Sequence, residues 1–367
     1  MFDFGKILKV NVFGASHAPD IGVLITGIPK GEKIDFDELL SFMKRRAPGN
    51  NPFSTPRKED DIPEFITGIE NGVTSGEPIK AIIKNTNVKS KDYGNLEFVP
   101  RPGHADYTAY IKYGGKEDMR GGGKFSGRLT APICIAGGII KQILARRGIF
   151  MGAHIFAVHG IKDDRFSPTD VSLKDFENVW QKDFPVINDQ KGEAIKQEIL
   201  KYKEQKNSVG GIVECSVTGV PAGIGEPMFY GVENQMSSAM FAIPAVKGIE
   251  FGAGFDASEM TGSENNDDFY FDGEVVKTKT NNCGGILGGI TNGMPINFKV
   301  AFKPTPSIAL PQTSIDISEK KETTLEIKGR HDPCIVQRAV PVVEAVSAMV
   351  LYDMLLQDEA LKNRKEE

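Results

Sequence analysis

The sequence contains few of the residues that build disulfide frameworks and metal sites. Its 367 residues include only 4 cysteines, 5 histidines and 1 tryptophan. The cysteines (Cys134, Cys215, Cys283 and Cys334) form no C-x-x-C pair, so we expect no zinc site, no redox motif and no bound metal. Thiols spaced this widely are typical of a reducing compartment, which favours a cytoplasmic protein.

The chain also lacks a long hydrophobic run and an excess of positive charge. Its longest apolar stretch, residues 131–144, is interrupted by glycines and by Lys141, which makes it too short and too polar to span a membrane. The first ten residues contain no apolar core of a signal peptide. The formal net charge is −5, whereas nucleic-acid binders are more often basic. We therefore expect neither a membrane nor a nucleic acid as a partner.

Helical and strand patterns are interspersed along the chain, without the strict alternation of a doubly wound sheet. The patterns predict helices over 35–46, 130–147, 192–203 and 341–356, and strands over 149–158, 209–217 and 295–302. The helix at 130–147 is apolar on most faces, so we expect it to be buried between layers. No linker composition appears. Residues 1–367 are predicted to form a single domain, with a peripheral charge-rich segment at 163–206 and a frayed end at 362–367.

Two polar runs between residues 101 and 130 are poorly explained by packing. The first reads R-P-G-H-A-D (101–106) and the second R-G-G-G-K-F-S-G-R-L-T (120–130). Three consecutive glycines leave the backbone bare, so an anion can approach its N–H groups closely. Arginine and lysine side chains in the second run add positive charge, and His104 in the first adds a group that titrates near neutral pH. Together they predict a phosphate-bearing ligand that undergoes proton chemistry.

Each of these features also has a purely structural interpretation. A single histidine is more often a hydrogen-bonded structural residue than a catalyst, and glycine-dense runs are usually turns. Three of the 5 histidines, however, lie in glycine- or arginine-rich runs: His17, His104 and His331. The second polar run is not a Walker loop, because Asp118 stands where the first glycine is required and Phe125 where a serine or threonine is required. No G-x-G-x-x-G opens a helix after the first strand, which argues against a Rossmann site.

Seven motifs, taken together, resemble the chorismate synthase family over nearly the whole chain. In order they are F-G-A-S-H (13–17), R-R-A-P-G (45–49), R-P-G-H-A-D-Y-T (101–108), G-G-G-K-F-S-G-R-L-T-A (121–131), N-N-C-G-G-I-L-G-G-I (281–290), K-P-T-P-S-I (303–308) and G-R-H-D-P-C (329–334). Only residues 163–206 contain little that is similar. The resemblance implies an α+β fold, a β-α-β sandwich of the chorismate synthase type with central buried helices between antiparallel sheets.

The resemblance also implies a reaction. It is that of a carbon–oxygen lyase, which eliminates phosphate from 5-enolpyruvylshikimate 3-phosphate in a 1,4 sense to give chorismate, in the shikimate pathway of aromatic amino acid biosynthesis. It implies reduced FMN as cofactor, NADPH as an indirect electron source, and a homotetramer. No additional domain is present to make the reduced flavin, so an external flavin reductase or another supply is expected. The phosphates and carboxylates of these ligands repel one another, and a dense set of arginine and lysine side chains can hold them together.

The matching positions imply roles for individual residues. His17 would protonate the leaving phosphate, His104 would keep the reduced flavin in its productive protonation state, and Asp332 would help flavin N5 to accept the ring proton. Ser16 and Ser126 would be hydrogen-bonding relays. The cofactor-binding residues would be Lys124, Phe125, Ser126, Pro244, Ala245, Gly288, Lys303, Pro304, Thr305, Pro306, Ser307 and Arg330. The substrate-binding cations would be Arg45, Arg46, Arg57, Arg120, Arg128 and Arg338.

The sequence departs from the family pattern around this presumed site. Ala15 and Leu129 stand where the family usually has Glu, Pro52 where it often has Arg, and Lys124-Phe125 where it has Arg-Ser. A lysine lacks the planar fork of an arginine, and a phenylalanine cannot donate a hydrogen bond, which leaves open an altered flavin affinity. The alternatives to an active lyase are a non-catalytic flavin- or phosphate-binding homologue and an RNA-binding protein that uses the R-G-G run. The acidic net charge disfavours the second.

Overall fold

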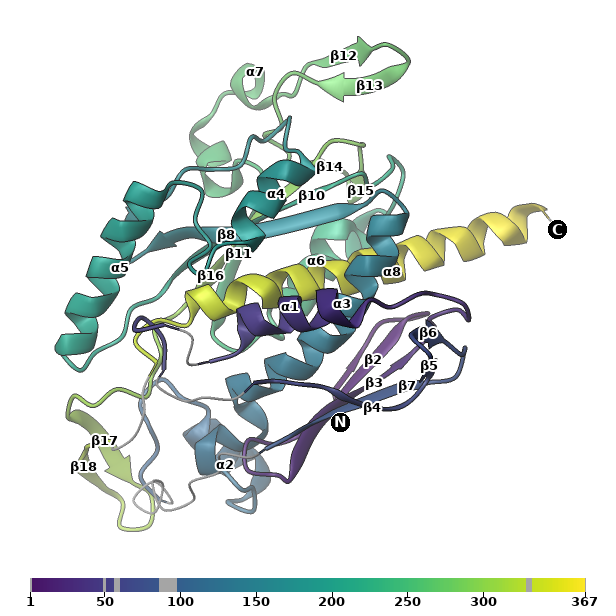
Figure 1. Ribbon diagram of the computed structural model, residues 1–367. Coiled ribbons are helices and arrows are strands. Elements are labelled where there is room, and N and C mark those ends of the chain that lie inside the picture. The colour runs from purple at the N-terminus through teal and green to yellow at the C-terminus, as the bar shows by residue number, and fades with distance from the viewer. Residues whose placement is uncertain (1, 49–50, 56–59, 86–97, 328–331, 367) are drawn as a thin grey trace.

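The computed structural model describes residues 2–48, 51–55, 60–85, 98–327 and 332–366. Within them, two five-stranded antiparallel sheets form the outer layers of a sandwich (Figure 1). The first sheet has the strand order β1-β2-β3-β7-β4 and the second has the order β11-β16-β10-β8-β9. The first contains β1 (Phe2–Phe4), β2 (Lys9–Gly14), β3 (Asp20–Thr26), β4 (Glu64–Thr67) and β7 (Ile79–Lys84), and the second β8 (Phe150–Val158), β9 (Ile161–Lys162), β10 (Gly211–Thr218), β11 (Val246–Phe251) and β16 (Ile296–Phe302).

Three helices fill the space between the sheets: α1 (Phe36–Arg46), α3 (Thr130–Arg146) and α8 (Val336–Glu366) (Figure 1). Helix α3 packs on β3 and β7 of the first sheet, and α8 packs on β8 and β10 of the second. One continuous cluster of buried apolar side chains joins these layers. The predicted sandwich with central buried helices is therefore confirmed.

Two segments in this core are long and apolar enough to span a membrane by composition alone, Gly127–Arg146 and Val336–Asn363. Their most apolar windows are 83% and 94% buried inside the protein. The apolar residues of α3 and α8 thus pack in the interior of the sandwich and do not indicate a membrane span.

The remaining elements are shorter and lie around the sandwich. They are four hairpins, β5–β6 (Ile69–Glu70, Val73–Thr74), β12–β13 (Phe269–Asp272, Val275–Thr278), β14–β15 (Ile286–Leu287, Ile290–Thr291) and β17–β18 (Gln312–Asp316, Lys321–Leu325), the helices α2 (Asp106–Tyr113), α4 (Leu173–Trp180), α5 (Asp189–Glu204), α6 (Val232–Met240) and α7 (Gly262–Asn265), and the 3₁₀ turns η2 (Arg120–Phe125), η3 (Gly127–Leu129), η4 (Met228–Tyr230) and η5 (Gly254–Glu259).

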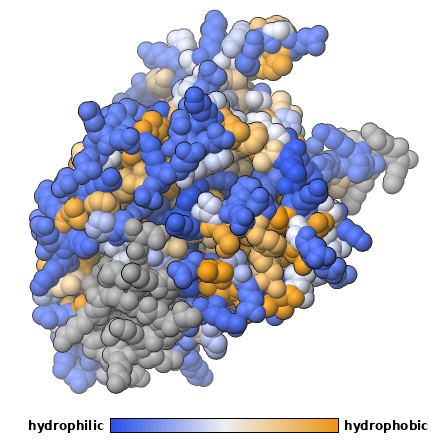
Figure 2. Space-filling model, in the orientation of Figure 1, coloured by the Kyte–Doolittle hydropathy of each residue, from blue (hydrophilic) through white to orange (hydrophobic). Residues whose placement is uncertain are grey.

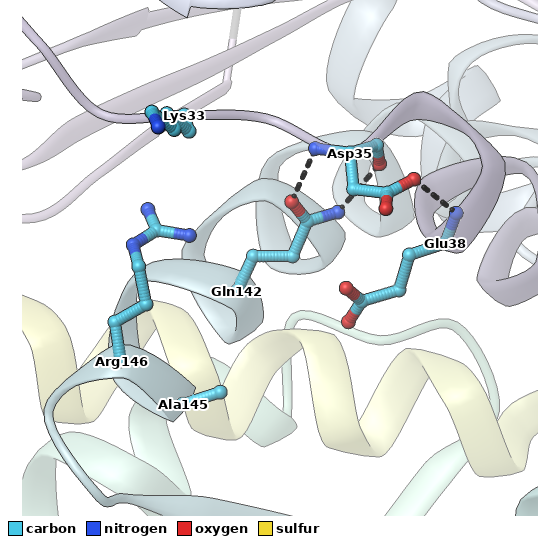
Figure 3. A pocket seen from close by; sticks show the side chains of 6 residues that line it. All are labelled: Lys33, Asp35, Glu38, Gln142, Ala145 and Arg146. Atoms are coloured by element: carbon cyan, nitrogen blue, oxygen red, sulfur yellow. Dashed lines mark hydrogen bonds between the residues drawn. The ribbon is translucent and has the colours of Figure 1, made fainter.

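Helix α1 begins where the sequence predicts, but its cap is completed by a different residue. Asp35 Oδ1 accepts hydrogen bonds from Asp37 N at 2.9 Å and Glu38 N at 3.0 Å. In a capping box, the Glu38 side chain would reach back to Asp35 N. Instead, Asp35 N donates to Gln142 Oε1 at 2.8 Å, and Gln142 Nε2 donates to Asp35 O at 2.8 Å (Figure 3). A buried glutamine of α3 therefore fixes the start of α1.

The ends of α3 and α8 differ from the predictions. Helix α3 begins at Thr130 and ends at Arg146, one residue before the predicted end, and the 3₁₀ turn η3 runs directly into its start, so Leu129 takes the N-cap position. Helix α8 starts at Val336, five residues before the predicted start at Pro341. Pro341 therefore lies inside the helix, where it cannot donate the hydrogen bond to the carbonyl of Gln337 and its ring crowds that carbonyl. The helix continues to Glu366, with an ion pair of 2.6 Å between Lys362 and Asp358, and fraying of residues 362–367 stays a prediction.

The charge-rich segment 163–206 packs against β8 through α4 and α5 (Figure 1). Phe166, Val171, Phe176 and Val179 form a small buried cluster of their own beneath α4. The segment thus lies at the outside of the second sheet. It contains a small apolar core of its own, which its many charged residues did not lead us to expect.

Candidate active site

The glycine loop before α3 is the centre of the candidate site. Gly121, Gly122 and Gly123 have φ angles of 61°, 93° and 52°, a region that residues with side chains rarely adopt. A Cβ on Gly121 would lie 2.5 Å from His17 Cε1 and 2.6 Å from Ser16 Oγ. The backbone N–H of Ser16 donates to Gly123 O at 3.1 Å. The end of β2 and the glycine loop are therefore locked together, with His17 lying directly on the loop.

His104 reaches the same loop from the other polar run. A Cβ on Gly122 would lie 3.4 Å from His104 Nε2 and 3.6 Å from Ser126 Cβ. Two histidines that are far apart in the sequence, His17 and His104, thus lie against adjacent glycines. The fold brings together the two imidazoles that the sequence predicts to be catalytic, and both predicted serine relays lie beside them.

Two buried neighbours hold the imidazole of His104. Asp106 Oδ1 lies 2.7 Å from His104 Nδ1. Arg101 donates from Nε to Asp106 Oδ2 at 2.7 Å and from Nη2 to Asp106 Oδ1 at 2.8 Å, and its Nη1 donates to Ser307 Oγ at 3.2 Å. Burial raises the pKa of the Asp106 carboxyl, but hydrogen bonds from Arg101 and His104 outweigh burial and hold this pKa well below its usual value. Asp106 is therefore an anion at neutral pH.

Arg46 and Arg128, both predicted to bind substrate, share one buried carboxylate. The Nη1 atoms of the two side chains donate to different oxygens of Asp61, whose side chain is fully buried. Arg46 also donates to Thr130 Oγ1 at 3.1 Å and to Gly127 O at 3.0 Å. Burial raises the pKa of the Asp61 carboxyl, but the two guanidinium groups outweigh it and hold the pKa below its usual value. The three groups form a buried cluster of net charge +1 beside the glycine loop.

Asp332, predicted to be catalytic, is bound by Arg338 at the start of α8. Arg338 Nη1 donates to Asp332 Oδ2 at 2.8 Å, and Arg338 Nε donates to Arg46 O at 3.0 Å. Burial raises the pKa of the Asp332 carboxyl, although Arg338 opposes this shift. A raised pKa favours the protonated carboxyl, which suits a group that exchanges protons.

Arg45, also predicted to bind substrate, faces the core instead. Its Nη1 and Nη2 donate to the two oxygens of Glu344 at 2.9 Å and 2.6 Å, and Lys141 Nζ donates to the same carboxylate. The Glu344 side chain is fully buried and also accepts from Ala153 N at 3.1 Å. Successive residues of a helix point about 100° apart, which explains why Arg45 and Arg46 have separate partners. A substrate role for Arg45 remains a prediction that these contacts do not favour.

The predicted cofactor-binding residues Ala245 and Lys303 lie next to each other. Lys303 N donates to Ala245 O at 2.9 Å, and Ala245 has a φ of 75°, which is uncommon for a residue with a side chain. Lys303 Nζ donates to Gly103 O, the residue before His104. Burial and the neighbouring charge of Lys247 lower the pKa of Lys303. In the described ranges neither ammonium group has a carboxylate within ion-pair distance, so this corner of the site attracts anions.

Residues 304–307, which follow Lys303, lie beside residues 101–106. A Cβ on Gly103 would lie 3.6 Å from Pro306 Cβ, and Ser307 accepts from Arg101 as described above. Thr305 O accepts from Ser208 Oγ at 2.7 Å. Pro304 lies within the same 303–307 segment, and half-buried Pro244 directly precedes Ala245. The predicted catalytic and cofactor-binding segments are therefore in contact.

Lys124 and its neighbours in the glycine loop have partners within the chain. Lys124 Nζ donates to Glu117 Oε1 at 2.8 Å and lies 3.6 Å from the centroid of the Tyr113 ring. Phe125 is half-buried, and Ser126 Oγ accepts from Arg128 N at 3.3 Å. The ammonium group of Lys124 is thus directed towards α2 and Glu117, and a ligand phosphate would have to compete with that carboxylate.

The fold does not bring every predicted residue to the loop. Gly288 is at an exposed turn of the β14–β15 hairpin, and the next residue, Gly289, accepts a hydrogen bond from Val232 N at the start of α6. In Figure 1 this hairpin lies far from the β17–β18 hairpin, which follows the 303–307 segment. Arg57 and Arg330 fall outside the described residues, and so does the side chain of Arg120.

The unusual residues of this chain have structural roles. Leu129, which stands where the family usually has Glu, is 7% exposed and belongs to the main core. Pro52 O accepts from Lys203 Nζ at 2.6 Å, which connects its loop to α5. Ala15 O accepts from Asn85 Nδ2 at 3.4 Å. The contacts of Pro52 and Ala15 use backbone carbonyls that any residue would provide, so only the departure at Leu129 has a side-chain explanation.

Several residues of the site were not predicted. Arg101 and Asp106 belong to the R-P-G-H-A-D run, and a carboxylate two residues after a histidine is a signal that sequence reasoning can use. Asp61, Lys247 and Glu344 lie far in sequence from the cations that they contact or neighbour. No local pattern indicates their roles.

A separate hollow of about 330 Å³ opens between the start of α1 and the second half of α3 (Figure 3). Its lining residues are Lys33, Asp35, Glu38, Gln142, Ala145 and Arg146. None of the predicted site residues is among them. The hollow is therefore distinct from the convergence of histidines at the glycine loop.

Comparison with known proteins identifies the family. The family model described as chorismate synthase matches residues 8–356. The chain is 46% identical over 364 residues to the chorismate synthase of Lancefieldella parvula (96% of this chain, 95% of that one) and 47% identical over 354 residues to that of Pyrococcus abyssi (96% and 97%). It is also similar to a crystal structure of chorismate synthase at 27% identity, with a TM-score of 0.77 and coverage of 99% and 97%. The chain, with its two histidines on one glycine loop, belongs to the chorismate synthase family.

Proposed function

We propose that this chain eliminates phosphate from 5-enolpyruvylshikimate 3-phosphate to give chorismate, as a phosphate-eliminating lyase of its family. The observation that carries the proposal is that His17 and His104 lie against adjacent glycines, Gly121 and Gly122. Loss of phosphate from carbon requires a proton donor for the leaving group and a fixed positive field for the departing charge. The two imidazoles and the nearby guanidinium group of Arg128 can provide both.

The buried cluster of Arg46, Asp61 and Arg128 supports an anionic substrate. Arg128, which is 8% exposed, borders the glycine loop and can face a phosphate or carboxylate, whereas Arg46 is 2% exposed and acts through the shared carboxylate. Because Asp61 already orients both guanidinium groups, little reorganisation is needed when the anion arrives. Arg338 adds a third cation one contact away, through its hydrogen bond to Arg46 O.

The positions of the side chains support the proposed proton-transfer roles. His17, against Gly121, would donate its proton to the oxygen of the leaving phosphate. Asp332, whose raised pKa favours its protonated form, would help flavin N5 to accept the proton removed from the ring. Ser16 and Ser126 lie beside the same glycines, where their hydroxyl groups can relay hydrogen bonds.

Chorismate synthases use reduced FMN, and the residues present fit such a group. Thr305 Oγ1 is buried without a hydrogen-bond partner among the described residues, although it lies in a predicted cofactor-binding segment. Lys303 and Lys247, which have no carboxylate within ion-pair distance in the described part of the chain, provide positive charge nearby that suits a phosphate. When bound, reduced FMN supplies the electron density that helps the substrate phosphate leave. The chain would hold it with the 303–307 segment and place His104 Nε2 beside it.

The supply of reduced flavin and the location of the protein follow from the same proposal. The chain would receive reduced FMN from an external flavin reductase, with NADPH as the indirect electron source, in the cytoplasm. The four cysteines, none of them in a disulfide, are consistent with a reducing compartment.

A homotetramer is proposed from the exposed apolar surface. Phe269 and Phe271 on the β12–β13 hairpin are 62% and 76% exposed, and Phe229 and Phe255 are 79% and 81% exposed. Figure 2 shows hydrophobic side chains at this hairpin, at the top of the view. Aromatic side chains exposed to this extent are expected to be covered by other copies. Light scattering after gel filtration tests this, and Phe271→Asp should give a smaller particle.

The decisive test is an anaerobic assay with reduced FMN and 5-enolpyruvylshikimate 3-phosphate. Phosphate and chorismate should appear in equal amounts. His17→Ala should lower kcat by about 10² to 10⁴-fold, the usual contribution of a positioned acid. Absence of both products with the wild-type protein would rule out the proposed reaction.

A non-catalytic flavin-binding homologue is the second candidate. It is favoured by Lys124, whose ammonium group is held by Glu117 rather than presented to a ligand. Under this alternative, the wild type and His17→Ala would bind FMN equally well and neither would release phosphate. A titration of FMN fluorescence, run beside the assay, separates the two candidates.

A further inference from the structure

We propose that Asp106 is the positioning residue that fixes which nitrogen of His104 faces the glycine loop. The imidazole has two nitrogens with different surroundings. Nδ1 lies 2.7 Å from Asp106 Oδ1, whereas Nε2 lies against Gly122. The catalytic consequence rests on the proposed function of this site, but the orientation of the ring is a property of the chain itself.

The geometry determines the tautomer of a neutral His104. Asp106 is an anion, so its oxygens only accept hydrogen bonds. If Nδ1 carried a lone pair, it would face a carboxylate oxygen at 2.7 Å, and the two would repel. The proton must therefore be on Nδ1, although Arg101 Nη2 also lies 3.1 Å from this atom. Arg101 Nη2 instead donates to Asp106 Oδ1, at 2.8 Å.

Asp106 can perform this task because its own position is strongly constrained. Arg101 binds it with the backbone N–H at 3.0 Å and with two side-chain arms, and the remaining arm donates to Ser307. His104 N donates to Arg101 O at 3.1 Å, which closes the loop between the two residues. The carboxylate therefore has four donors in fixed places, and the imidazole cannot rotate without losing one of them.

The consequence concerns Nε2. With the proton fixed on Nδ1, neutral His104 presents the lone pair of Nε2 to the ligand space over Gly122. It can take a proton there from an N–H or O–H of a bound ligand, forming one N–H bond as the ligand bond breaks, and return it to the same place. The resulting imidazolium is neutralised by Asp106, as in other carboxylate–histidine pairs of active sites.

Other histidines in the chain show that a carboxylate neighbour alone is not sufficient. His154 is fully buried, and its nitrogens lie 3.3 Å from Asp163 and 3.0 Å from Glu214, so neither faces a ligand. His159 is exposed and lies 2.8 Å from Glu198. Glu198 therefore provides a matched control at a surface pair of the same chemistry.

Asp106→Asn tests the proposal directly. An asparagine keeps the size, but its oxygen is expected to take the place of Oδ2, where two donors of Arg101 converge. The amide NH₂ then faces His104 Nδ1 and donates to it, which moves the ring proton to Nε2. Solid-state ¹⁵N NMR of histidine-labelled protein, without any ligand, reports this change as an exchange of the two ring nitrogen signals of His104. The signals are assigned by their absence in His104→Gln.

The kinetic assay measures the catalytic consequence. Asp106→Asn should lower kcat by about 10²-fold and change the KM for the substrate by less than about threefold, because the acid–base step and not binding is disturbed. Asp106→Glu, which keeps the carboxylate, should preserve the Nδ1–H tautomer and recover part of kcat. Glu198→Gln should alter only the signals of His159 and leave kcat unchanged.

The outcomes separate the inference from the proposed function. Unchanged His104 signals in a folded Asp106→Asn variant overturn the inference, whatever the activity. If Asp106→Asn does not fold, an Nε2–H tautomer in the wild type or in Asp106→Glu overturns it equally. A wild type that makes no chorismate, but whose His104 tautomer reverses in Asp106→Asn, refutes the proposed reaction and supports the positioning role.

Discussion

Gly137 of α3 lies directly against Ala345 of α8: a Cβ added to Gly137 would be 2.3 Å from both Cα and Cβ of Ala345. Real side chains do not approach a backbone so closely, so the two central helices can pack at this distance only with glycine at position 137. The contact lies in the middle of the sandwich, between the helix that follows the glycine loop and the helix that carries Arg338.

Gly137→Ala should therefore destabilise the protein, even though alanine favours a helix by about 1 kcal/mol. Forcing two backbones apart in a packed core costs about 1–3 kcal/mol after this gain. Urea unfolding measures the loss. The neighbouring Gly138→Ala is the matched control, because its Cβ would meet side-chain atoms and no backbone atom: Leu39 Cδ1 at 2.6 Å and Phe42 Cδ1 at 3.0 Å. A Gly137→Ala variant as stable as the control would contradict the close packing.

Gly121→Ala should impair the reaction more than the fold. The new Cβ would lie 2.5 Å from His17 Cε1, so either the imidazole or the loop must move. A displacement of about 1 Å in a catalytic group can lower the rate by about 10²-fold. The measurement is kcat for chorismate formation together with the thermal midpoint.

Gly114→Ala separates the two effects of that substitution. Gly114 has a φ of 62°, close to the 61° of Gly121, but a Cβ there would meet nothing within 4 Å. Both variants should lose about 1–2 kcal/mol from the backbone conformation. Only Gly121→Ala should lose activity, and equal kcat values in the two variants would show that contact with His17 is unimportant.

Asp61→Asn should make the stability of the protein less dependent on pH in the acid range. The pKa of Asp61 is lowered from 3.8 in the folded protein, so its ion pairs contribute stability above about pH 4, and this contribution is lost as the pH falls through the folded-state pKa. At pH 7 the variant should be about 3 kcal/mol less stable, because two buried arginines lose their shared anion. The difference should shrink below pH 4.

Unfolding in urea at several pH values between 7 and 3 checks this prediction. Asp268→Asn is a suitable control, because Asp268 is exposed and its ion pair with Lys279 is 3.3 Å long. It should change the stability by less than about 1 kcal/mol at any of these pH values. A constant difference between the wild type and Asp61→Asn down to pH 3 would mean that Asp61 is not the titrating group.

Asp353→Ala should loosen the start of the first sheet. The Asp353 carboxylate accepts from Lys6 N, Ile7 N and Leu8 N at 3.0, 2.8 and 2.9 Å, and it is 5% exposed. Removing it leaves a buried N–H at Leu8 without an acceptor, so we expect a loss of about 2–4 kcal/mol. Hydrogen exchange should be faster at Leu8 than in the wild type. Asp358→Ala, on an outer turn of the same helix, should leave that exchange rate unaltered.

Local patterns predicted those elements whose cause is local. Helix α1 begins after Asp35 because an aspartate side chain can cap two N–H groups without help from elsewhere. The buried central helix was evident from its apolar faces. The start of α8 was missed because Pro341 reads as a helix start, whereas the tertiary fold extends the helix back to Val336, which is fully buried.

The site residues also divide into those that a local motif indicates and those that only the tertiary fold brings together. His17, His104 and the glycines could be predicted because each lies in a short motif whose residue types point to anion and proton chemistry. The partners of the arginines could not, because Asp61 and Glu344 meet Arg46 and Arg45 only in the folded chain. Gly288 is the opposite case. Its position in a family motif implied a contact with the cofactor, but the fold places it in the β14–β15 hairpin, away from the glycine loop.

Glu344 has a consequence for how the molecule comes apart. Its carboxylate is shared by Arg45 of α1, Lys141 of α3 and the backbone of β8. If any one of these layers separated from the others, a buried charge would lose its partner. A partly unfolded state in which one layer is detached is therefore energetically unfavourable. Denaturation should accordingly be cooperative, with both sheets and the helices between them melting in a single step.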